Sequence, residues 1–101
     1  MRTLLTVTMD VASANKAIMD GSLPKIIQST VERIKPEASY FFANNDGSRC
    51  GLMVFDMKDT SEIPPIAEPF FMGLNAKVNF LPVMNSDELQ KGLGAWMSSQ
   101  K

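Results

Sequence analysis

The fold is decided at residues 40–57, which have the sequence YFFANNDGSRCGLMVFDM. The segment Asn44-Asn45-Asp46-Gly47 is typical of a tight hairpin turn, because Asn, Asp and Gly tolerate the positive φ angles that such turns require. Apolar residues flank this turn on both sides. The pattern therefore predicts an antiparallel hairpin, with one strand centred on residues 40–43 and the other over residues 50–57.

The remaining elements follow on either side of this hairpin. Alternating polar and apolar residues predict a first strand at 3–9, and apolar residues at helical spacing predict a helix that is interrupted at 21–24 and ends at Pro36. A second helix, broken or bent by Pro64, Pro65 and Pro69, is expected after the hairpin, followed by a fourth strand at 77–84 and a last helix over 86–101. The order βαββαβ with a C-terminal helix is the ferredoxin-like signature of an α+β fold with a four-stranded antiparallel sheet.

The predicted strands are apolar on both faces. Leu52 and Val54 share one face of the 50–57 strand, while Met53 and Phe55 share the other. A sheet with one solvated face would instead alternate apolar with polar residues. The simplest way to bury the second face is a two-fold homodimer, in which a second copy of the chain packs sheet against sheet. The alternative to this homodimer is that the last helix folds over the second face of its own sheet.

Composition limits the domain organisation and the chemistry. The chain has 101 residues, of which 45% are hydrophobic and 21% charged, and this predicts a single domain over 1–101, with a core at 1–85 and a C-terminal helix at 86–101. It has one cysteine, Cys50, and no histidine. A Ser/His/Asp or Cys/His nucleophile is therefore excluded, no metal or cofactor is expected, and Cys50 is interpreted as a small buried apolar residue.

Charge and hydropathy limit the partners. A net charge of −1 without a basic stripe argues against nucleic acid. No apolar run approaches the roughly 20 residues that span a bilayer, and the N-terminus alternates like a strand instead of a signal peptide. We therefore expect a cytoplasmic protein without a membrane partner.

Five short motifs, spread over the chain to about Gly92, carry a resemblance to a known family. They are Asp20-Gly21-Ser22-Leu23-Pro24, Lys35-Pro36-Glu37-Ala38 with Tyr40-Phe41, Ala67-Glu68-Pro69-Phe70, Asn75-Ala76, and Pro82-Val83-Met84. The chain resembles an uncharacterised family of bacterial proteins of about the same length in the dimeric α+β barrel superfamily. The resemblance implies a ferredoxin-like subunit paired through its sheet, but no catalytic residues. The superfamily includes cofactor-independent monooxygenases, muconolactone-isomerase-like enzymes and haem-degrading enzymes, and the missing histidine counts against the last of these.

Three carboxylates are candidate catalytic groups. Asp10 and Asp56 end the first and third strands, which we expect to be parallel neighbours. The two carboxylates would then lie at one end of the sheet and form a pair with one raised pKa, suited to proton transfer. The alternative is that each caps the helix or turn that follows. Glu68 lies beside the helix irregularity at Pro69, where it would face a cavity as a base or, alternatively, remain solvated.

Candidate ligand-binding residues are aromatic side chains and amides that would line an apolar pocket between sheet and helices. They are Tyr40, Phe42, Phe55, Phe70, Phe71, Asn75 and Asn79. The alternative is that the aromatic residues, with the methionines, form only the core and a dimer interface, and that the amides make structural hydrogen bonds.

Three functions remain open on these residues. The first is a homodimeric module that binds a small apolar molecule between sheet and helices. The second is a cofactor-independent monooxygenase- or isomerase-like enzyme, and the third is an interaction scaffold without a ligand. A binding module needs a cavity, an enzyme needs a titratable group inside it, and a scaffold needs neither.

Overall fold

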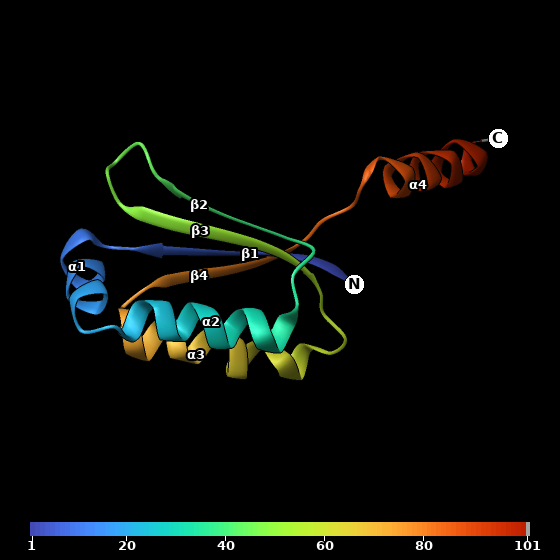
Figure 1. The fold of residues 1–101 in the computed structure, drawn as a ribbon. Helices are drawn as coiled ribbons and strands as arrows, with labels where there is room; N and C mark the ends of the chain where they lie inside the picture. The colour runs from blue at the N-terminus through green and yellow to red at the C-terminus, as the bar shows by residue number, and fades with distance from the viewer. Residues whose placement is uncertain (101) are drawn as a thin grey trace.

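The computed structural model describes residues 1–100, and its elements follow the predicted order (Figure 1). They are β1 (Arg2–Met9), α1 (Val11–Met19), α2 (Ser22–Ile34), β2 (Ala38–Ala43), β3 (Arg49–Asp56), the 3₁₀ turn η1 (Thr60–Glu62), α3 (Ile63–Leu74), β4 (Lys77–Pro82) and α4 (Ser86–Ser99). The predicted C-terminal helix is confirmed over Ser86–Ser99, whereas Lys101 lies outside the described residues.

The four strands form one sheet in the order β2-β3-β1-β4, and all neighbours are antiparallel. The predicted ferredoxin-like α+β fold is confirmed. The prediction that β1 and β3 are parallel is wrong, because Arg2 pairs with Asp56 and Met9 pairs with Arg49. The crossover through α1 and α2 returns β2 parallel to β1, and the hairpin then reverses the chain, so β3 must run against β1.

The core lies between the sheet and the layer formed by α2 and α3 (Figure 1). Alternate residues of β1 are buried, and Leu5 in its centre is flanked by Met53 on β3 and Phe80 on β4. Phe55 is also fully buried in this layer. The alternation confirms which face of the hairpin meets the helices.

The prediction that the prolines could break the second helix into two pieces is wrong, because α3 is continuous over Ile63–Leu74. Pro64 and Pro65 occupy its first turn, where a backbone N–H would have no helical partner, and Pro69 lies inside it. The predicted capping box ahead of them is confirmed around η1: the N–H of Ser61 donates to Asp59 Oδ2 at 3.0 Å, and the N–H of Asp59 donates to Glu62 Oε2 at 3.0 Å. Pro69 therefore removes one backbone hydrogen-bond donor from the helix, while Ile66, Ala67 and Phe70 on its inner face stay buried.

The other face of the sheet, called here the open sheet face, is not covered by any helix among residues 1–100 (Figure 1). Helix α4 extends beyond the end of the sheet, and none of the residues Ser86–Ser99 is buried. The radius of gyration is 16.4 Å, compared with about 13 Å expected for a compact chain of this length. The expectation that the last helix folds over its own sheet is therefore wrong. Within residues 1–100, no helix has the length and apolar character needed to cross a membrane.

Candidate functional site

The open sheet face presents aromatic and aliphatic side chains to solvent. Strand register places Tyr40 opposite Leu52, and Phe42 opposite Cys50. Tyr40 is 66% exposed and Phe42 44% exposed. Candidate residue Asn79 is also on this face, opposite Thr6. The residues of the open sheet face are Leu4, Thr6, Thr8, Ala38, Tyr40, Phe42, Cys50, Leu52, Val54, Lys77, Asn79 and Leu81.

Cys50 is buried although it belongs to this face. Its Sγ lies 3.6 Å from the hydroxyl oxygen of Thr8, the residue directly opposite it on β1. The interpretation of Cys50 as a small buried residue is confirmed.

A small apolar cavity, called here the core cleft, lies between the sheet and the helices. Its volume is about 20 Å³, and it is lined by Leu5, Val7, Met9, Leu23, Ile27, Phe41, Gly51, Met53 and Phe70. Gly51 permits the Phe41 ring to lie against β3, because a Cβ at this position would be 3.0 Å from Cδ1 of Phe41. A cavity of this size is about one water-sized sphere and has no polar lining, so it gives a water molecule no hydrogen-bond partner, and it admits a larger apolar group only if a side chain moves.

The predicted aromatic ligand residues are distributed among separate environments. Phe70 lines the core cleft, and Phe55 is buried elsewhere in the core. Phe71 is exposed on α3, while Tyr40 and Phe42 lie on the open sheet face. The structure does not bring these residues into one pocket. Phe41, which also lines the cleft, was missed as a candidate, although its alternation with Phe42 places it on the opposite face of its strand.

Asp10 and Asn75 meet at one end of the sheet, in a depression called here the polar end pocket. It has a volume of about 280 Å³ and is lined by Thr8, Asp10, Asp46, Ser48, Asn75 and Lys77. Asn75 ends α3 with a positive φ of 51°, and its Nδ2 donates to Asp10 Oδ1 at 3.4 Å. The other members were missed, because only the antiparallel direction of β3 brings the hairpin turn to the end of β1.

Both carboxylates of the polar end pocket favour the ionised form. The backbone N–H of Ser13 donates to Asp10 Oδ2 at 2.9 Å and lowers the pKa of Asp10. The hydroxyl and N–H of Ser48 donate to Asp46 and lower its pKa in the same way. The pocket thus offers acceptors and the Lys77 ammonium to a polar group, but no carboxyl poised to give up a proton near neutral pH. Residues 1–100 contain no cluster of metal-ligating side chains.

Asp56 lies at the opposite end of the sheet, where it pairs with Arg2 across β1 and β3. With ~3.3 Å per residue along β1, about 25 Å separates it from Asp10. Asp56 accepts hydrogen bonds from the Lys58 ammonium and, at 2.7 Å, from the N-terminal amine, and these cations lower its pKa to about 2. The predicted Asp10–Asp56 pair with one raised pKa is therefore wrong. Asp10 caps α1 by accepting from the N–H of Ser13, as the alternative interpretation has it, whereas Asp56 pairs with Lys58 and the N-terminal amine instead of capping the turn that follows.

Asp56→Asn is expected to flatten the dependence of stability on pH. The folded pKa of Asp56 is below its usual value of 3.8, so its ion pairs stabilise the fold above pH 3.8 and are lost as the pH falls towards about 2. Urea unfolding measured at several pH values in this window should show a steeper loss for the wild-type chain than for the variant. Parallel curves would contradict the ion-pair assignment.

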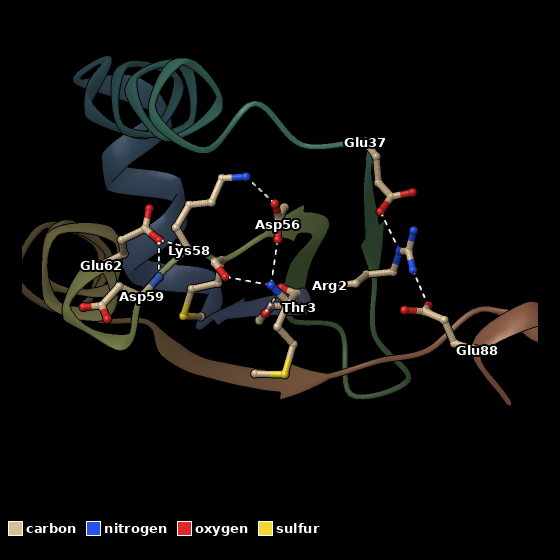
Figure 2. Close-up of polar contacts among 10 residues, drawn as sticks. Arg2, Thr3, Glu37, Asp56, Lys58, Asp59, Glu62 and Glu88 are labelled. Carbon is tan, nitrogen blue, oxygen red and sulfur yellow. Dashed lines mark hydrogen bonds and ion pairs between the residues drawn. The ribbon is translucent and has the colours of Figure 1, made fainter. Parts of the chain in front are cut away.

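Beside Asp56, Arg2 joins three elements at this end of the sheet (Figure 2). Its Nε donates to Glu37 at 2.8 Å, and its Nη1 donates to Glu88 at the start of α4. The Glu37 hydrogen bond, with the charges of both glutamates, raises the pKa of Arg2. Arg2 therefore fixes the first turn of α4 to the end of β1.

Glu68 is exposed on α3 and lines none of the cavities described above. The helix stays continuous at Pro69, and the side chain of Glu68 is exposed next to it. Its solvated interpretation fits this position.

No protein-family model, no curated protein and no solved structure matches this chain. Its relation to the bacterial family in the dimeric α+β barrel superfamily stays a prediction that rests on the five motifs.

Proposed function

We propose that the chain is a homodimeric module that pairs through its open sheet face and binds a small apolar molecule in the core cleft. The observation that carries the ligand class is the lining of this cleft, whose nine residues offer no polar side chain. Apolar enclosure favours a hydrocarbon or aromatic group, because a polar ligand would lose its hydrogen bonds there without replacement.

The open sheet face supports the dimer. Its exposed side chains Tyr40, Phe42 and Leu81 belong to the two edge strands. The half-buried Val54 and Leu4 join them across one end of the sheet, while the other end is more polar on β1 and β4. Contiguous apolar surface of this kind is unusual on a monomer. When two copies pair about a two-fold axis, one contact buries the open sheet face of both subunits.

The side chain of Phe41 lines the core cleft and is the one that would rotate to enlarge it. It lies on the edge strand β2, and its ring is partly exposed to solvent while contacting Gly51. A ligand larger than the present cavity of about 20 Å³ requires this ring to rotate outward. The position of Phe41 on an edge makes such a rotation compatible with an otherwise packed core.

An interaction scaffold without a ligand is the second candidate. The small volume of the core cleft favours the scaffold, because a core that is already well packed needs no bound ligand to be stable. None of the nine residues that line the cleft is titratable, so we propose no reaction there.

Benzene titration followed by amide chemical shifts separates these two candidates. The binding module predicts saturable shifts confined to the lining of the core cleft. Ile27→Phe, which places a ring at the half-buried mouth of the cleft, should abolish them, whereas Phe71→Ala on the outer side of α3 should preserve them. A wild-type protein without saturable shifts would overturn ligand binding and leave the scaffold.

A further inference from the structure

Helix α4 has an apolar stripe that nothing else among residues 1–100 covers. Leu89, Leu93, Trp96 and Met97 recur at the spacing i, i+4, i+7, i+8, which aligns them on one side of the helix. All four are exposed, and Trp96 is 58% exposed. Lys91 and Ser98 lie on the opposite, polar side. The helix is thus built for a contact that a single chain leaves unmade.

The composition of α4 makes this contact necessary for the helix. It has 14 residues, near the lower limit at which even alanine-rich helices persist alone in water. It also contains Gly92 and Gly94, each of which disfavours a helix relative to alanine, and neither has a neighbour in the chain within 4 Å of a Cβ position. Packing of the apolar stripe must therefore supply the stability that the sequence of α4 lacks.

The first turn of α4 is held in an orientation that directs the helix away from its own sheet. Asn85 and Glu88 form a complete capping box, and Glu88 also pairs with Arg2. The N–H of Val83 bonds the carbonyl of Arg2 at 3.1 Å, so the linker between β4 and α4 is short and fixed. Folding α4 back over its own open sheet face would break these contacts.

We propose that α4 packs its apolar stripe on the second copy of the chain, so that the two subunits exchange their C-terminal helices. The inference rests on the dimer of the proposed function. Figure 1 shows α4 beyond the end of the sheet and on the side opposite to α2 and α3, which is the side that the partner occupies when two open sheet faces meet. Two-fold symmetry then gives each subunit one α4 that it donates and one surface that binds the α4 of the other subunit.

The exposed area suits such a dimer. The apolar stripe of α4 joins the exposed apolar residues of the sheet and linker, which are Tyr40, Phe42, Leu81 and Met84. One aromatic side chain accounts for ~150–250 Å², so the combined set exposes on the order of 1,000 Å² per subunit. A stable interface of standard size buries about 800 Å² per partner. The open sheet face, the linker and α4 of one chain together expose about this area.

Trp96 is the only tryptophan of the chain and reports directly on α4. Exchange predicts a blue-shifted, buried emission at concentrations where sedimentation shows a dimer. Dilution should shift this emission to that of solvent-exposed tryptophan, with the same midpoint as dissociation. A dimer with solvent-exposed emission would overturn the exchange and leave the dimer standing. A buried emission that survives dissociation would place α4 on its own chain and also overturn it, and a monomer at every concentration would overturn both proposals.

Two matched variants sharpen this experiment, because both place glutamine in α4. Leu93→Gln removes a leucine from the apolar stripe and should weaken dimerisation at least about tenfold, since burying one such side chain contributes enough for that factor. Lys91→Gln alters the polar side and should leave the dissociation constant within about twofold of the wild-type value. If the two variants changed the dissociation constant equally, the apolar stripe of α4 would not be part of the dimer contact.

Discussion

Phe55→Ala is expected to lower the free energy of unfolding by about 3–5 kcal/mol, because the ring is removed from a packed core that cannot close over the space. Phe55 is 1% exposed and is paired across the sheet with Thr3, which is also buried. Small domains have a total stability of only about 5–15 kcal/mol, so the variant should unfold at a much lower urea concentration. The measurement is urea unfolding by circular dichroism, at one fixed protein concentration because dimerisation adds to apparent stability.

Phe71→Ala provides the matched control for this variant. Phe71 is 44% exposed on the outer side of α3, and we expect the same substitution to change the free energy of unfolding by less than about 1 kcal/mol. If both phenylalanines had equal effects, the assignment of Phe55 to the core and of Phe71 to the surface would be contradicted.

Thr6→Lys is expected to weaken dimerisation about 100-fold or more. Thr6 lies in the middle of the open sheet face, between Leu52 on β3 and Asn79 on β4. In the separate subunit the lysine extends into water, but in a sheet-to-sheet contact its charge is desolvated without a partner, which costs about 3–5 kcal/mol. Sedimentation velocity over a concentration series measures the change in the dissociation constant.

The control is Thr60→Lys, which introduces the same side chain at an exposed position of η1, away from the open sheet face. It should leave both the dissociation constant and the fold unchanged. Circular dichroism of Thr6→Lys at low concentration should match that of the wild-type chain, because the lone subunit tolerates the lysine. Dimerisation of undiminished strength in Thr6→Lys would exclude the centre of the sheet from the interface.

Local sequence patterns predicted the elements of this fold because each pattern has a local physical cause. The Asn44–Gly47 turn, the prolines at the start of α3 and the capping residues ahead of α4 act within a few residues of themselves. Alternation in β1 and β3 likewise assigned side chains to two faces, and the observed register agrees with it. These features needed no knowledge of distant contacts.

The candidate site was less predictable because it depends on strand direction. Taking β1 and β3 as parallel put Asp10 beside Asp56, whereas the antiparallel sheet puts Asp10 beside Asn75 and the hairpin turn. The core cleft depends on the missing side chain of Gly51, which creates the space for Phe41. Likewise, the contact of the first turn of α4 with β1 joins Arg2 and Glu88, which are far apart in the sequence.

Sedimentation equilibrium of the wild-type protein tests the central claim, that the open sheet face joins two copies of the chain. The account predicts a concentration-dependent equilibrium that approaches a mass twice that of the 11.1 kDa chain, together with a shift towards monomer in Thr6→Lys but not in Thr60→Lys. A single species of 11.1 kDa at every concentration of the wild-type protein would contradict it.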